Sequence, residues 1–286
     1  MWTCATPSHL SLWYRNPARA DVCCHLVVPP SVSAASRMVV VLHGTERNPV
    51  SYRASWTDWA RRHDRIVICP LFDRDGWRGS AGYLLGGVLD TDRRPQPERA
   101  WAYTALTEIA ARVRAAFGLV EHRFDLWGHS AGAQFVHRYL LFAPDAPVRS
   151  AIAANAGWYT LPALNTRFPY GLDHPDLGLT RDRALAWTAR PLLLMRGDRD
   201  VERDAALRVT TRADRQGRNR FERAATMHRA GHLLDPGCRW RLVDVRGTAH
   251  QFDQMAGAAQ RLLSDPIEGE HESVLTDCSS TAHRNR

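Results

Sequence analysis

The chain has 286 residues, 44% of them hydrophobic and 24% charged, which is ordinary for a soluble globular protein with a sizeable core. No apolar run approaches the length of a membrane-spanning helix, so we expect no membrane partner. The formal charge of +8 comes from 38 basic and 30 acidic residues. The basic residues, all of them arginines, are spread among the acids rather than clustered with aromatic residues. We therefore predict no nucleic-acid partner.

Six cysteines show neither a CxxC pair nor the even, dense spacing of a disulfide-stapled secreted domain. The first 20 residues lack the basic stretch and apolar segment of a signal peptide. We expect a cytoplasmic protein in which the cysteines are mostly small buried residues.

Short apolar runs recur along the chain, separated by longer stretches of helical period. This alternation predicts an α/β fold with an eight-stranded, mostly parallel sheet and helices on both faces. The expected strands are Leu10–Arg15, Val22–Val28, Met38–Leu42, Ile66–Cys69, Phe124–Trp127, Arg149–Ala154, Pro191–Arg196 and Trp240–Val245. The first two strands are joined by too few residues for a crossover helix and should form an antiparallel hairpin. The expected helices are near Tyr52–Arg62, Pro97–Phe117, Ala133–Leu141, Arg203–Ala213, Arg220–Ala230 and Phe252–Leu263.

The segment Gly128-His129-Ser130-Ala131-Gly132 lies between the fifth expected strand and a helix-like stretch. Glycines two positions to either side of the serine suit a turn so tight that any Cβ there would clash. Such a turn exposes the Ser130 hydroxyl at the end of the sheet, as in a nucleophile elbow. We predict that Ser130 is a nucleophile.

A serine hydroxyl needs a histidine to take its proton and a carboxylate to orient that histidine. In a parallel sheet these partners should follow later strands. His250 lies just after the last expected strand, and Asp200 lies in the turn after the seventh. Asp198 is the alternative acid, because the elbow pattern fixes the chain order and not the offset; it is nearer the strand and suited to bracing the loop.

The oxyanion formed during attack on an acyl carbon must be held by preorganised donors. We expect the amide of Ala131 to be one donor and the amide of Thr45, in the loop after the third strand, to be the other. His43 precedes the nucleophile in the chain and is expected to brace that loop, and His129 is expected to be structural as well.

His228 and His232 have the spacing of two metal ligands on one helix face. No acidic residue follows the first of them in the position that such a site requires, so we interpret them as surface or core-edge histidines. We predict no metal site.

Two connections, 71–96 and 158–188, are too long to be simple turns and leave the same end of the sheet as Ser130. Long ordered loops at that end usually build the pocket. Their aromatic residues Trp77, Trp158, Tyr159 and Tyr170 therefore predict an apolar or aromatic substrate pocket, or else they only pack the loops down.

We expect one domain over residues 1–265 that includes both long segments. After it the composition turns polar, and we interpret 266–286 as a disordered tail.

With these residues in order, the chain resembles an α/β-hydrolase, and more narrowly the bacterial hydrolases related to poly(3-hydroxybutyrate) depolymerases and feruloyl esterases. The resemblance runs from about Arg37 to Leu263. It is carried by the segments Leu42-His43-Gly44, Gly128-His129-Ser130-Ala131-Gly132-Ala133-Gln134-Phe135, Ala154-Asn155-Ala156-Gly157-Trp158-Tyr159-Thr160 and Gln216-Gly217-Arg218-Asn219-Arg220. The resemblance implies a Ser-Asp-His triad, carried here onto Ser130, Asp200 and His250, and no cofactor. Ala133 and Arg246 depart from the glycine and the proline that relatives tend to carry there.

The leading prediction is a carboxylic-ester hydrolase that works through an acyl-enzyme on a small-molecule ester. Acyl transfer or amide cleavage is an alternative that needs the same triad. A non-catalytic ligand-binding protein on a hydrolase scaffold is an alternative of another class, since fold does not fix function.

Overall fold

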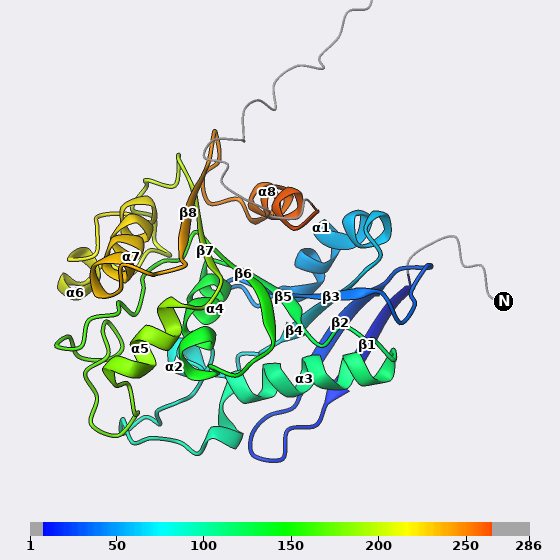
Figure 1. The fold of residues 1–286 in the computed structure, drawn as a ribbon, viewed down its shortest axis with the longest axis horizontal. Helices are drawn as coiled ribbons and strands as arrows, with labels where there is room; N and C mark the ends of the chain where they lie inside the picture. The colour runs from blue at the N-terminus through cyan, green and yellow to red at the C-terminus, as the bar shows by residue number, and fades with distance from the viewer. Residues whose placement is uncertain (1–7, 265–286) are drawn as a thin grey trace, which may run out of the picture.

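A computed structural model describes residues 8–264, and Figure 1 shows one sheet flanked by helices. The eight strands lie in the order β1-β2-β4-β3-β5-β6-β7-β8. β1 pairs antiparallel with β2, β2 pairs antiparallel with β4, and all the other pairs are parallel. The predicted α/β class and mostly parallel sheet are therefore confirmed. The strands are β1 (Ser8–Tyr14), β2 (Val22–Val28), β3 (Arg37–Leu42), β4 (Arg65–Leu71), β5 (Phe124–His129), β6 (Val148–Ala154), β7 (Leu192–Gly197) and β8 (Arg241–Val245).

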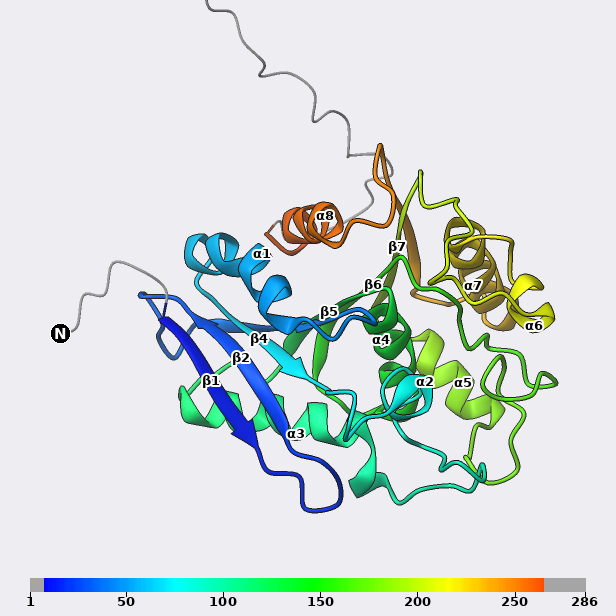
Figure 2. The ribbon, with the colours of Figure 1, turned by 180° about the vertical axis from the view of Figure 1, so that it is seen from behind.

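Helices cover both faces of the sheet. They are α1 (Pro49–Arg62), α2 (Gly79–Gly82), the 3-10 helix η1 (Glu98–Ala100), α3 (Ala102–Ala116), α4 (Ala131–Phe142), α5 (Arg181–Thr188), α6 (Thr211–Asp214), α7 (Arg220–Leu234) and α8 (Phe252–Ser264). In both views α1 and α8 lie side by side on one face, and α3 and α4 lie on the other (Figures 1 and 2). No helix within residues 8–264 is long and apolar enough to cross a membrane.

The core is split in two by the sheet because successive side chains of a strand point to opposite faces. On β3, Val40 and Leu42 join the cluster under α3 and α4, whereas Val39 and Val41 join the cluster under α1 and α8. All four side chains are fully buried. This double burial explains why the parallel strands appear in the sequence as continuous apolar runs.

One predicted helix, Arg203–Ala213, is wrong over most of its length, since only Thr211–Asp214 is helical. The Asp204 carboxylate accepts hydrogen bonds from the amides of Ala206 and Leu207. Such local bonds compete with helix formation. Conversely, the long connection 158–188 contains α5, whose first turn is capped by the Thr180 hydroxyl. The predicted tail at 266–286 lies outside the described residues.

Candidate active site

The turn between β5 and α4 presents Ser130 in an uncommon backbone conformation. Its φ of 56° and ψ of −110° lie outside the regions that residues with side chains usually occupy. A Cβ on Gly128 would lie 2.4 Å from the backbone of Gly132, and a Cβ on Gly132 would lie 2.3 Å from the Leu42 carbonyl oxygen. Both glycines are therefore required by close backbone approach, and the turn has the form of a nucleophile elbow.

Three residues far apart in the sequence form one hydrogen-bonded chain. His250 Nε2 lies 3.1 Å from Ser130 Oγ, and His250 Nδ1 lies 2.7 Å from Asp200 Oδ2. Since the carboxylate can only accept, Nδ1 carries the proton, and Nε2 is left as the acceptor for the Ser130 hydroxyl. The Asp200 side chain is 2% exposed, whereas that of His250 is 27% exposed. The arrangement thus joins a buried carboxylate to a half-buried serine through one histidine.

Asp200, and not Asp198, contacts the histidine. Asp198 is exposed. The second oxygen of Asp200 lies 3.3 Å from the guanidinium of Arg220, whose side chain is 1% exposed. Arg220 also donates to both oxygens of Asp204, at 2.8 and 2.9 Å. These bonds with Arg220 are the main reason that the pKa of Asp204 is lowered.

Asn155 connects the two loops that carry Asp200 and His250. It follows β6 with a φ of 51°. Its side-chain amide donates to the Ala249 carbonyl and accepts from the Gly197 amide, both at 2.8 Å. Neither Asn155 nor Arg220 was assigned a role from the sequence, although both stand in segments that carry the family resemblance.

The ring of His129 packs 4.6 Å from that of His250, centroid to centroid. Its Nδ1 lies 3.2 Å from the hydroxyl of Tyr52, which accepts a hydrogen bond from the Gly44 amide. Burial, with a smaller effect of His250 and Arg220, holds the pKa of His129 well below its usual value. His129 is therefore a neutral, buried support behind His250, in line with the structural role expected for it.

The loop after β3 approaches the serine. A Cβ on Gly44 would lie 3.8 Å from Ser130 Cβ, and Thr45 is the next residue. His43 Nδ1 donates to the Gly44 carbonyl, and its Nε2 accepts from the Phe72 amide. Burial lowers the pKa of His43 to about 3, so the ring braces this loop as a neutral group.

Ala131 directly follows Ser130, and Thr45 directly follows Gly44, on which a Cβ would lie 3.8 Å from Ser130 Cβ. Ala131 is the first residue of α4, where the amide has no intrahelical acceptor. Within residues 8–264 neither amide donates to another group of the chain. The assignment of these two amides to an oxyanion hole stays a prediction.

The four aromatic residues predicted to line a pocket are buried. Trp77 packs against Phe72, with ring centroids 5.1 Å apart. The Tyr159 backbone N–H donates to the side-chain amide of Gln216 at 2.9 Å, and the Tyr159 carbonyl accepts from the same amide at 2.7 Å. Trp158 contacts the ring of Tyr170 at 4.8 Å. These contacts anchor the two long segments, and substrate binding by the four rings stays a prediction.

His228 and His232 lie with their Nε2 atoms 3.1 Å apart on α7. In the described part of the chain, no group of three or more histidine, cysteine or acidic side chains is arranged to hold a metal ion.

Solved structures share this architecture. The structure of poly(aspartic acid) hydrolase-1 from Sphingomonas sp. KT-1 matches with a TM-score of 0.87 and 30% identity, over 91% of this chain and 100% of that one. The poly(3-hydroxybutyrate) depolymerase LpqC from Bordetella parapertussis matches with a TM-score of 0.85 and 32% identity, over 91% of each chain. The chain belongs to the α/β-hydrolase superfamily.

This α/β-hydrolase also shares its fold with an S-formylglutathione hydrolase from Agrobacterium tumefaciens, at 18% identity and a TM-score of 0.59, over 91% of this chain and 95% of that one. No family model and no curated protein matches the chain. The two structures of 30% identity or more are both of hydrolases, and the chain is accordingly a hydrolase.

Proposed function

We propose that this α/β-hydrolase cleaves carboxylic esters through an acyl-enzyme formed on Ser130. The observation that carries the proposal is the continuous chain of hydrogen bonds from Ser130 through His250 to Asp200, at 3.1 and 2.7 Å. In this series of hydrogen bonds the base His250 contacts the nucleophile Ser130, and the acid Asp200 fixes the tautomer of His250. Covalent acyl transfer requires this arrangement.

In the first half-reaction Ser130 Oγ attacks the ester carbonyl carbon while its proton passes to His250 Nε2. The carbonyl oxygen gains the negative charge and accepts hydrogen bonds from the amides of Ala131 and Thr45. Each such donor is worth about 2.7 to 4 kcal/mol of barrier. When the tetrahedral intermediate collapses, the bond to the leaving oxygen breaks, and His250 gives its proton to the departing alcohol.

In the second half-reaction water replaces the alcohol. His250 takes a proton from the water, which attacks the acyl carbon, and returns the proton to Ser130 Oγ as the acid leaves. Asp200 keeps its negative charge throughout and stabilises the imidazolium. Asp200 is buried and also held by Arg220, which favours one fixed orientation of this carboxylate. No cofactor is needed in either half.

Amide cleavage is the second candidate, because one of the two similar hydrolases acts on poly(aspartic acid), whose units are joined by amide bonds. The other is a depolymerase of poly(3-hydroxybutyrate), a polyester. The excess of arginine in this chain favours anionic substrates in either case. We propose that short acyl, hydroxyacyl or aromatic acyl groups bind beside the two long segments. Trp77, Trp158, Tyr159 and Tyr170, which are 6% exposed or less, would shape this acyl pocket by anchoring the segments and not by direct contact.

The test is a comparison of rates on p-nitrophenyl esters of increasing chain length, a feruloyl ester, a hydroxybutyrate oligomer and an aspartate oligomer. We expect turnover of at least one ester, and a fall of about 10³-fold or more in Ser130→Ala. Turnover of the aspartate oligomer alone would favour the amidase. Ester turnover that is unchanged in Ser130→Ala, or no turnover of any substrate, would reject the proposal.

A further inference from the structure

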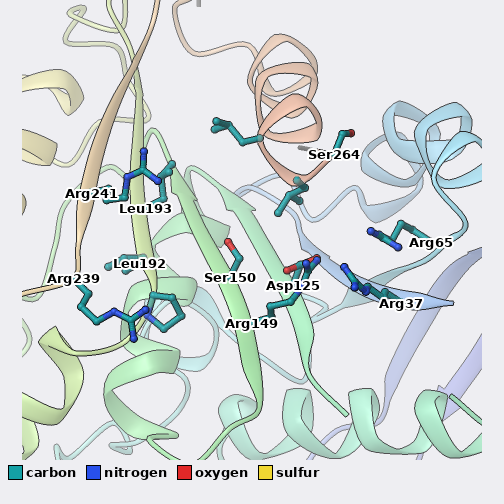
Figure 3. Close-up of a pocket in the computed structure, with 13 residues that line it drawn as sticks. Arg37, Arg65, Asp125, Arg149, Ser150, Leu192, Leu193, Arg239, Arg241 and Ser264 are labelled. Atoms are coloured by element: carbon teal, nitrogen blue, oxygen red, sulfur yellow. The ribbon is translucent and has the colours of Figure 1, made fainter. Parts of the chain in front are cut away.

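Figure 3 shows a cavity of about 770 Å³. It lies at the end of the sheet where the parallel strands begin, whereas Ser130 lies where they end. Arg37, Arg65 and Arg241, which line it, are the first residues of β3, β4 and β8. Ser130 follows the last residue of β5. A strand rises about 3.3 Å per residue, so the two ends are separated by roughly 20 Å. The cavity is therefore separate from the candidate active site.

The charge of this cavity is strongly positive. Among residues 8–264, its lining includes five arginines, Arg37, Arg65, Arg149, Arg239 and Arg241, and one acid, Asp125. Arg149 forms an ion pair with Asp125. Within residues 8–264 the other four arginines pair with no carboxylate. A concave surface with this excess of cations concentrates anions.

Burial increases the need for a counter-charge. Arg65 is half-buried, and its Nε has no hydrogen-bond partner in the described part of the chain. Burial lowers its pKa, and the neighbouring guanidinium groups of Arg37 and Arg149 lower it further. The Asp125 carboxylate is fully buried and already bonded to Arg149. The chain thus holds several cations together here without an equal number of described anions.

The arginines form two groups with an apolar surface between them. Arg37, Arg65 and Arg149 lie to one side in Figure 3, and Arg239 and Arg241 lie to the other. Measured between backbones across the sheet, Arg149 on β6 lies two strands, about 10 Å, from Arg241 on β8, and Arg37 on β3 lies four strands, about 19 Å, from it. The apolar surface consists of Pro191, Leu192 and Leu193 at β7 and Leu262 and Leu263 of α8.

We propose that this cavity binds an elongated anion that carries carboxylates on both sides of an apolar portion. Each carboxylate would accept the paired N–H groups of a guanidinium, which match its two oxygens. Such an anion has two possible sources. One is a free dicarboxylate, and the other is the acidic stretch of the chain itself, which begins directly after Ser264 of the cavity wall and contains Asp265, Glu268, Glu270 and Glu272.

The experiment is calorimetric titration of the full chain with decanedioate at constant ionic strength, with decanoate as the single-carboxylate comparison. Arg37→Gln/Arg241→Gln removes one exposed arginine from each group. Arg61→Gln/Arg99→Gln removes two exposed arginines elsewhere and is the matched control. We expect one decanedioate to bind per chain, and decanoate to bind more weakly. Affinity for decanedioate should fall at least about tenfold in Arg37→Gln/Arg241→Gln and stay unchanged in the control variant. Equal unfolding midpoints of the two variants show that the fold is retained.

A third variant, with all four acids of the stretch changed to their amides, distinguishes the sources. If it binds decanedioate about tenfold or more tightly than the native chain, and the two cavity substitutions abolish this gain, the chain's own carboxylates occupy the cavity. If native and neutralised chains bind equally, the ligand is a free anion. Absence of one-to-one binding in both chains would overturn the proposal, and so would affinity that survives in Arg37→Gln/Arg241→Gln.

Discussion

The guanidinium of Arg220 lies 3.3 Å from the carboxylate of Asp200, and the two side chains are 1% and 2% exposed. The other oxygen of Asp200 contacts His250. Arg220 thus fixes the carboxylate that orients the histidine, although it touches neither the histidine nor the serine in this arrangement. It is a positioning residue in the proposed mechanism.

Arg220→Gln should lower kcat by about ten- to hundredfold, equivalent to roughly 1.4 to 2.7 kcal/mol of barrier, with little change in KM. The reason is that Asp200 would lose a buried partner and its fixed orientation. Arg220→Lys should recover part of the loss because it restores one charge. Arg218→Gln, an exposed neighbour, is the control. Equal kcat in Arg220→Gln and Arg218→Gln would contradict this role.

Replacement of Asn155 separates side-chain bonding from backbone conformation. Asn155→Ala and Asn155→Gly both remove the two bonds that join the loops of Asp200 and His250, so both should lower kcat to a similar extent. Because the residue has a φ of 51°, the glycine variant should be more stable than the alanine variant by about 1 kcal/mol. Urea unfolding measures this difference. A more stable alanine variant would argue against it.

Gly132→Ala should destabilise the protein by about 3 kcal/mol or more, because the new methyl group would lie 2.3 Å from the Leu42 carbonyl oxygen. Gly257→Ala in α8 is the matched substitution, since among residues 8–264 its methyl group would meet just the end of the Arg261 side chain, at 4.0 Å. This second variant should be more stable than the native protein by up to about 1 kcal/mol. Thermal unfolding compares the two, and similar midpoints would exclude the proposed clash.

His43 should make folding less stable in acid. Its pKa is about 3 in the folded protein, against about 6.5 in an unfolded chain. Below pH 6.5 the unfolded state therefore binds a proton that the folded state does not, and stability falls by about 1.4 kcal/mol per pH unit until pH 3 is reached.

Between pH 7.5 and pH 5.5 the free energy of unfolding, measured with urea, should thus fall by about 1.4 kcal/mol more in the native protein than in His43→Gln. In His122→Gln, a substitution at an exposed position, the free energy of unfolding should fall by as much as in the native protein. An equal loss in the native protein and in His43→Gln would show that His43 is not the group responsible.

The sequence predicts the sheet well because strands that are buried on both faces appear in it as continuous apolar runs. Each of the eight apolar runs became a strand, with ends displaced by no more than about two residues. The chain order of Ser130, Asp200 and His250 follows from the same apolar runs, since each of them ends a strand or follows one.

Features that depend on loop geometry could not be predicted in this way. From the sequence, either Asp198 or Asp200 could be the acid of the triad. The structure distinguishes them because Asp200 lies within hydrogen-bond distance of His250. The contact of Arg220 with Asp200 joins residues 20 positions apart through an irregular segment for which a helix was expected. The five arginines of the cavity likewise lie far apart in the sequence, between positions 37 and 241. They come together because each lies at or within two residues of the start of a strand of the same sheet.

The proposed mechanism depends on Ser130 being an activated nucleophile. Incubation of the native protein with a fluorophosphonate, followed by peptide mass spectrometry, shows whether Ser130 reacts. Ser130 should be labelled, esterase activity should disappear in proportion to labelling, and His250→Ala should react far more slowly while still folded. Labelling of another residue, or a native protein that keeps its esterase activity when Ser130 is fully labelled, would contradict the account.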